Sequence, residues 1–137
     1  MTRLEPNDSL YIITGWFWDS RTEDGSGRYP FGGYFGLDEQ RLEGRLSDDC
    51  GTSRITGTMT QGVLEFEKTY RKKVYQKKPS VWHYKFEKKN GVWVGGWSDK
   101  KIETTYIDHN PSMQARCLTL PIWEAYKALN KRRLDGQ

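Results

Sequence analysis

Short runs of alternating apolar and polar residues, each followed by a turn signal, recur along most of this 137-residue chain. A period of two residues is typical of β-strands, because successive side chains point to opposite faces of the sheet. Polar stretches separate the runs, and Asn90-Gly91 is a dipeptide that tight hairpins prefer. The pattern predicts about eight strands. Their expected ranges are 10–18, 29–37, 41–47, 53–60, 63–70, 81–88, 92–98 and 112–119.

Sequential strands joined by turns and modest loops favour an up-and-down antiparallel order, in which each strand pairs with its neighbours in sequence. A closed barrel of such strands has no exposed edges, whereas an open sandwich leaves backbone groups unpaired. We therefore predict an all-β protein, a single up-and-down barrel formed within residues 10–119, and keep the sandwich as the alternative. A length of 137 residues leaves little room for a second core, so residues 1–137 are expected to form one domain.

Residues 121–134 alone have a helical pattern. Pro121 suits a first helical position, and basic residues crowd the last turn, where they complement the helix dipole. Ile122, Tyr126 and Leu129 recur at helical spacing and form an apolar stripe. We expect this stripe to cover the outside or the open end of the barrel, or to pack against another subunit.

Strand alternation also predicts which side chains point into the barrel. In the 63–70 strand, the face that carries Phe66 also carries Lys68, so a lysine interrupts an apolar face. The same reasoning groups the aromatic side chains of the next two strands. The residues expected to contact a ligand are Trp16, Phe66, Lys68, Tyr70, Trp82, Tyr84, Trp93 and Trp97. The phase of the glycine-rich 92–98 strand stays open, and the reverse phase would place its tryptophans outside as an association patch.

Lys68 is the most distinctive of these residues. An unpaired buried ammonium is costly, so we expect Lys68 to reach the rim, to pair within the protein, or to bind an anionic group of a ligand. The surrounding aromatic rings would offer flat walls, with hydroxyl and indole N–H groups to orient a planar molecule. Ordinary core packing would use the same residues, and the sequence leaves the two interpretations open.

Three short motifs, Thr14-Gly15-Trp16, Leu42-Glu43-Gly44 and Ile55-Thr56-Gly57, resemble the first half of avidin-like barrels. The glycine and tryptophan near the N-terminus are also similar, more loosely, to those of lipocalins and the wider calycin group. The resemblance ends near Tyr70, and the basic segment and C-terminal helix depart from it. It implies a barrel with a ligand site in its mouth, and it assigns no biotin-binding residue.

Charge is unevenly distributed along the chain. The formal net charge is +4, yet residues 1–50 are acidic on balance, and residues 68–89 carry nine basic side chains and a single acid, Glu87. A solvated loop is one interpretation of this block, and a surface for an anionic partner is the other. The residues of that surface would be Arg71, Lys72, Lys73, Lys77 and Lys78. Because aromatic residues are interleaved with the cations, nucleic-acid binding is an alternative function.

Catalytic and metal-binding signals are weak. His83 and His109 are the only histidines, and Cys50 and Cys117 lie far apart, so paired spacing for a zinc site is missing. The adjacent acids Asp48-Asp49 lie in a predicted turn rather than across a cleft. We therefore expect no enzyme activity, no metal and no cofactor, with both thiols free.

The function that these observations predict is non-catalytic binding of a small planar or apolar molecule, which can carry an anionic group, inside an aromatic-lined barrel. The alternatives are a nucleic-acid-binding barrel and a structural or oligomeric interaction module, and a homo-oligomer would be compatible with each. The N-terminal run MTRLEPNDSL lacks the pattern of a signal peptide, and no window is long enough to span a bilayer. A cytoplasmic protein is expected.

Overall fold

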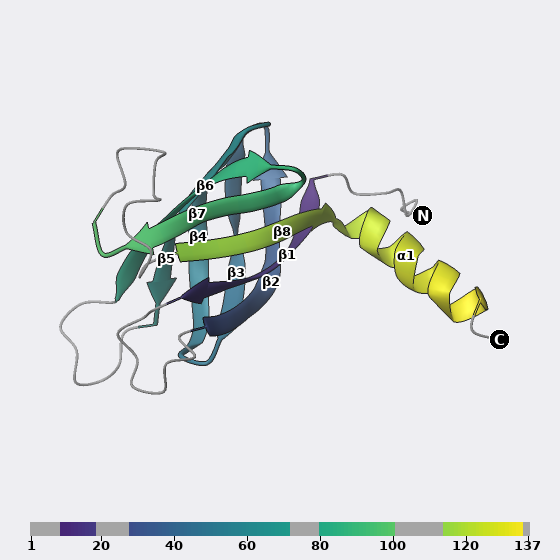
Figure 1. The fold of residues 1–137 in the computed structure, drawn as a ribbon, viewed down its shortest axis with the longest axis horizontal. Coiled ribbons are helices and arrows are strands. Elements are labelled where there is room, and N and C mark those ends of the chain that lie inside the picture. The colour runs from purple at the N-terminus through teal and green to yellow at the C-terminus, as the bar shows by residue number, and fades with distance from the viewer. Residues whose placement is uncertain (1–8, 19–27, 72–79, 101–113, 136–137) are drawn as a thin grey trace, which may run out of the picture.

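The computed structural model describes residues 9–18, 28–71, 80–100 and 114–135. Eight antiparallel strands form a closed barrel, in which each strand pairs with its neighbours in sequence and β1 pairs with β8 (Figure 1). The strands are β1 (Leu10–Trp18), β2 (Arg28–Asp38), β3 (Arg41–Asp48), β4 (Gly51–Met59), β5 (Val63–Tyr70), β6 (Val81–Lys89), β7 (Val92–Ser98) and β8 (Gln114–Pro121). The predicted up-and-down barrel is confirmed, and the sandwich alternative is wrong.

The predicted hairpin turn lies between β6 and β7. Asn90 and Gly91 have φ angles of 53° and 82°, and both positive values suit a two-residue hairpin turn.

Inward-facing glycines allow the strands to bend. At Gly44 of β3 and Gly57 of β4, a Cβ atom would lie within 2.0 Å of a carbonyl oxygen of the neighbouring strand. These close approaches let a barrel of eight strands curve tightly around its core.

Inward-facing side chains of all eight strands fill the barrel. The predicted phase of β5 and β6 is confirmed, because Phe66 and Tyr84 are buried. Trp97 is also buried, which decides the phase of β7 that the sequence left open. Trp93 is buried as well, so the outward association patch that the reverse phase of β7 would create is wrong. The buried apolar residues are Ile13, Phe17, Phe31, Phe35, Leu42, Leu46, Ile55, Leu64, Phe66, Tyr84, Phe86, Trp93, Trp97, Ala115 and Cys117.

The helix α1 (Ile122–Asp135) extends away from the barrel (Figure 1). Pro121 ends β8 instead of opening the helix, and no loop residue lies between the two elements. The helix therefore continues outward from the end of β8 rather than folding back. Tyr126 is 57% exposed and Leu129 is 65% exposed, so the expectation that this stripe covers the barrel is wrong. Among the described residues, no helix combines the length and apolar character needed to cross a bilayer.

Candidate ligand site

A pocket of about 260 Å³ lies at the end of the barrel that carries the β3–β4 turn. It is formed where β1, β5 and β7 end and where β2 and β6 begin, so side chains from most of the barrel converge there. The described residues that line it are Phe17, Tyr29, Cys50, Lys68, Tyr70, Trp82, Tyr84 and Trp97. Five of the residues predicted to contact a ligand are therefore brought together in one place.

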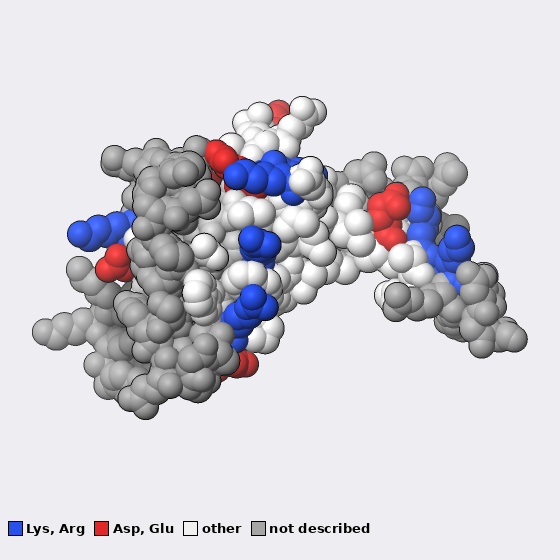
Figure 2. Space-filling model, in the orientation of Figure 1, with Lys and Arg blue, Asp and Glu red and all other residues white. Residues whose placement is uncertain are grey.

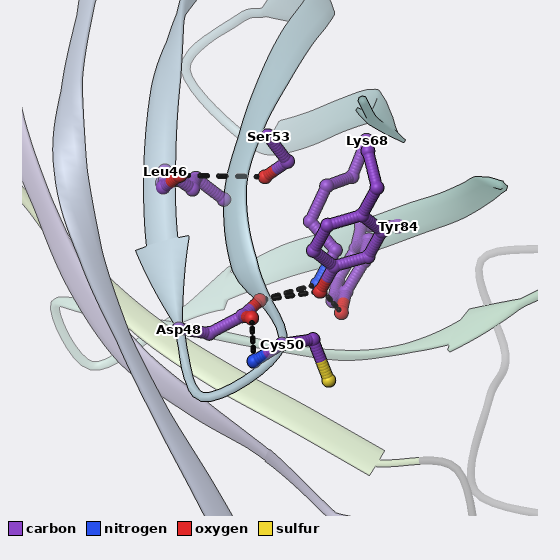
Figure 3. A network of polar contacts seen from close by, with 7 residues as sticks. Leu46, Asp48, Cys50, Ser53, Lys68 and Tyr84 are labelled. Carbon is purple, nitrogen blue, oxygen red and sulfur yellow. Dashed lines mark hydrogen bonds and ion pairs between the residues drawn. The ribbon is translucent and has the colours of Figure 1, made fainter. Parts of the chain in front are cut away.

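A buried ion pair lies beside this pocket. The Nζ atom of Lys68 is 3.0 Å from Oδ2 of Asp48, and the two side chains are 2% and 0% exposed (Figure 3). Lys68 also donates a hydrogen bond of 2.9 Å to the Tyr84 hydroxyl, and the Tyr70 hydroxyl donates one of 2.5 Å to the same Asp48 oxygen. Each charge therefore has an opposite charge and a phenol as partners, which offsets part of the cost of removing it from water.

Asp48 is the residue of this candidate site that the sequence interpretation did not include. It is the last residue of β3, and its Oδ1 atom accepts a hydrogen bond of 2.8 Å from the backbone N–H of Cys50 in the following turn. The predicted strand stopped at Ser47 and left Asp48 in the turn. The signal in the sequence was strand alternation, because Asp48 shares the inward face of Leu42 and Leu46 once the strand is extended by one residue.

Aromatic rings surround the Lys68 ammonium. Its Nζ atom lies 4.6 Å from the ring centroid of Phe17, 4.8 Å from that of Tyr70 and 4.9 Å from that of Tyr84. Such cation–π contacts stabilise a desolvated cation. Burial nevertheless lowers the pKa of Lys68 below its ordinary value of 10.5, and the Asp48 carboxylate opposes part of that change.

The two phenols remain neutral at physiological pH. Burial raises the pKa of both Tyr70 and Tyr84, and the hydrogen bond to Asp48 raises that of Tyr70 further. The group of four side chains therefore carries one positive and one negative charge, with no net charge. Lys68 is paired within the protein, and a ligand's anionic group would find its charge already compensated.

Two predicted ligand residues lie elsewhere in the core. Phe66 is buried below the pocket and stacks on Tyr84, with ring centroids 5.1 Å apart. Trp93 lines a different cavity with Tyr11 and Met59, and its indole N–H donates a hydrogen bond of 2.9 Å to Thr119. Both contribute to the packing of the barrel rather than to the pocket wall.

The placement of Trp16 among the interior residues is wrong. Gly15 and Phe17 occupy the inward face of β1, so strand alternation turns Trp16 outward. There the guanidinium carbons of Arg28 and Arg116 lie 4.9 Å and 6.0 Å from the Trp16 ring centroid. This residue belongs to an outer-surface cation–π group.

The predicted anionic-partner surface falls largely outside the described residues. Arg71 is exposed just after β5, whereas Lys72, Lys73, Lys77 and Lys78 lie in the undescribed range 72–79. On the face shown in Figure 2, the described basic side chains over the barrel stand apart from one another, and others lie together on α1. Nucleic-acid binding therefore stays a prediction from the sequence.

Metal binding has no support within the described ranges, which contain no group of three or more His, Cys, Asp or Glu placed to hold an ion. His83 lies 3.8 Å from Glu67, measured from Nδ1 to the carboxylate, and His109 lies outside the described residues. The two cysteines are not bonded to each other. Cys117 is buried, which raises the pKa of its thiol, and Cys50 is exposed beside the pocket.

Comparisons of the chain with protein-family models, with curated proteins and with solved structures find no match. The resemblance to avidin-like and calycin barrels therefore stays a prediction from short motifs. The strand pairing establishes the barrel, and the pocket is the feature from which a function can be inferred.

Proposed function

We propose that this protein binds a small, flat, uncharged organic molecule in the pocket beside the β3–β4 turn. The observation that carries the proposal is an aromatic-walled pocket in which Asp48 already compensates the positive charge of Lys68. Ligand sites in proteins typically combine apolar walls with a few fixed polar groups. The anionic ligand group expected from the sequence loses its main support, because Asp48 occupies the anionic position beside Lys68.

The volume of the pocket limits the size of the molecule. An apolar protein cavity of about 150 Å³ can hold benzene. A pocket of about 260 Å³ is larger than this but below the range of about 300–1,000 Å³ that is typical of drug-sized ligands. A molecule of one or two fused rings with a short substituent fits these limits.

The walls of the pocket are held in place by contacts of their own. Trp82 and Trp97 meet edge to face with ring centroids 5.2 Å apart, and the indole N–H of Trp97 donates a hydrogen bond of 3.0 Å to the Trp18 carbonyl. Phe17 stacks on Tyr29 at a centroid distance of 5.2 Å. Walls fixed in this way favour binding, because little side-chain freedom remains to be lost.

Tryptophan fluorescence during titration with 2-naphthalenemethanol tests the proposal. We expect saturable quenching, and Trp82→Ala should weaken binding by about tenfold because it removes one wall of the pocket. Trp16→Ala is the matched control, since that tryptophan lies on the outer surface, and it should leave affinity unchanged. Absence of saturable binding for one-ring and two-ring neutral probes would contradict the proposal.

A second candidate function, self-association, is favoured by the exposed apolar side chains Trp123, Tyr126 and Leu129 of α1. The occupant we propose is α1 of a second copy. Glu124 already pairs with Lys127 of its own helix at 3.4 Å, so the contact between the two helices would rest on the apolar side chains. Native mass spectrometry should show a dimer that Leu129→Glu dissociates and Tyr34→Glu, on the barrel, does not. A monomer at every concentration would contradict this function.

A further inference from the structure

Lys68 is a costly residue to place beside an apolar pocket. Its side chain is 2% exposed and its ammonium lies among three aromatic rings. Apolar side chains of similar volume often replace a buried ion pair without loss of stability, and sometimes with a gain. Folding alone therefore does not require a lysine here, and the chemistry of the amine offers a further reason for it.

The surroundings of Lys68 are those that activate a lysine as a nucleophile. A lysine desolvated in an apolar pocket loses its proton more readily than one on the surface, and the free amine then attacks carbonyl carbons. Asp48 Oδ2, at 3.0 Å, is placed to accept that proton. Tyr84, at 2.9 Å, holds the Nζ atom from a second direction.

We infer that the pocket takes a flat, conjugated aldehyde and that Lys68 binds it covalently as an imine, an inference that rests on the proposed ligand-binding function. The aromatic walls would stack on the conjugated part of such a molecule, as they would on any flat ligand. What distinguishes an aldehyde is the carbonyl carbon, which can form a bond with Nζ.

The reaction needs no oxidant or reductant. Asp48 takes a proton from the Lys68 ammonium, and the nitrogen lone pair forms a C–N bond with the aldehyde carbon. The carbonyl oxygen receives two protons that came from the ammonium, the C–O bond breaks, and water leaves. The nitrogen keeps one proton and forms a double bond to carbon, so the product is a protonated imine.

The charges beside the pocket are the same before and after this reaction. The positive charge stays on the Lys68 nitrogen, and the Asp48 carboxylate remains its counter-ion. An uncharged aldehyde is therefore matched to the site. An aldehyde with its own carboxylate near the carbonyl would bring a second negative charge close to Asp48, which is unfavourable.

Reductive trapping tests the inference. The unaltered protein is incubated at pH 7 with 2-naphthaldehyde and cyanoborohydride, and the labelled residue is located by peptide mass spectrometry. We expect one naphthylmethyl group on Lys68, formed at least about tenfold faster than on any other lysine, because the aromatic walls of the pocket hold the aldehyde beside Nζ, whereas surface lysines meet it only by collision. Excess 2-naphthalenemethanol, which has the ring but no carbonyl, should slow the labelling.

The alcohol separates the failure of this inference from the failure of the proposed function. If the alcohol binds but the aldehyde labels surface lysines no more slowly than Lys68, imine formation is overturned and ligand binding stands. If neither molecule binds, both are overturned.

A paired variant removes the chemistry without leaving an unpaired charge. Asp48→Asn with Lys68→Met should bind the alcohol and lose the selective label. The matched control is Glu65→Gln with Lys85→Met, which removes a 3.9 Å ion pair between β5 and β6 and should leave labelling of Lys68 unchanged. If the first variant does not fold, the peptide map of the unaltered protein decides the question by itself.

Discussion

Strand β3 carries one acid of each of two ion pairs, and the pairs have opposite surroundings. Asp48 points inward to Lys68, and their side chains are 0% and 2% exposed. Glu43 points outward to Arg54, and their side chains are 63% and 64% exposed. Water solvates each outer charge when its partner is removed, whereas an inner charge left alone stays in an apolar environment. Removal of one partner should therefore destabilise the fold more on the inner face of β3 than on its outer face.

The inner pair also has more partners. Asp48 accepts hydrogen bonds from Tyr70 and from the Cys50 backbone, and Lys68 donates one to Tyr84. The pair thereby links the β3–β4 turn to β5 and β6. The comparison predicts that substitutions in the inner group change stability strongly, and that those in the outer pair do not.

The largest effect is expected from Lys68→Met alone. It leaves the Asp48 carboxylate buried without a cation, and the free energy of unfolding should fall by roughly 3–5 kcal/mol. Urea unfolding followed by tryptophan fluorescence measures the change. Adding Asp48→Asn should restore most of the loss, because the buried charge is then absent. Strictly additive losses in the two single variants and the double variant would contradict the coupling.

A smaller loss is expected from Tyr70→Phe, which removes one hydrogen bond to a buried carboxylate and leaves the ion pair in place. Hydrogen bonds to charged groups contribute about 1.5–3 kcal/mol. The control is Tyr34→Phe, because Tyr34 is exposed on the outer face of β2. The same urea titration should give a change of less than about 0.5 kcal/mol for it. Equal losses in the two variants would count against the inner network.

The dependence of stability on alkaline pH sharpens the comparison further. Burial raises the pKa of Tyr84 above its ordinary value of 10.0, so the folded protein keeps a proton that the unfolded chain loses above that pH. The free energy of unfolding should therefore fall as pH rises past 10.0, by at most about 1.4 kcal/mol per pH unit for this tyrosine.

Lys68 contributes with the opposite sign. Because burial lowers its pKa, its destabilising effect is complete at lower pH and is relieved as pH rises toward its ordinary value of 10.5. The fall in the free energy of unfolding that Tyr84 causes should consequently be clearest above pH 10.5. Thermal unfolding across alkaline pH should show a shallower decline for Tyr84→Phe than for the unaltered protein. Identical slopes would mean that Tyr84 does not differ in protonation between the folded and unfolded states.

The smallest effect is expected from Glu43→Gln in the outer pair. Exposed ion pairs contribute about 0–1 kcal/mol, and salt screens them. Urea unfolding at low ionic strength should show a change within this range, and the difference should shrink at high salt. A loss comparable to that of Lys68→Met would remove the distinction between the two faces of β3.

Strand alternation predicted the barrel and much of the pocket, because a period of two fixes which face each residue occupies. It places Lys68 on the same face of its strand as Phe66 and Tyr70. Asp48 was not predicted because its partner Lys68 lies on β5, with β4 between the two strands, and because the predicted end of β3 was one residue short. Trp16 was misplaced because Ile13 and Phe17 occupy the inward face of β1, and the alternation then turns Trp16 outward.

The direction of α1 could not be predicted from the sequence pattern, for a different reason. An apolar stripe such as Tyr126 and Leu129 indicates that a surface favours contact, but not which surface supplies it. The absence of a loop between β8 and α1 decides the matter in this chain, and that depends on where the strand ends.

The inward-facing glycines limit which positions can be changed to make the barrel hold a different molecule. At Gly44 and Gly57 any side chain would collide with the backbone of the adjacent strand, so these positions are closed to substitution and the curvature of the wall is fixed with them. Redesign of the pocket for a larger or smaller molecule therefore has to use the replaceable rings at its mouth, such as Tyr29 and Trp82. The barrel thus separates positions that set its shape from positions that can be varied for selectivity.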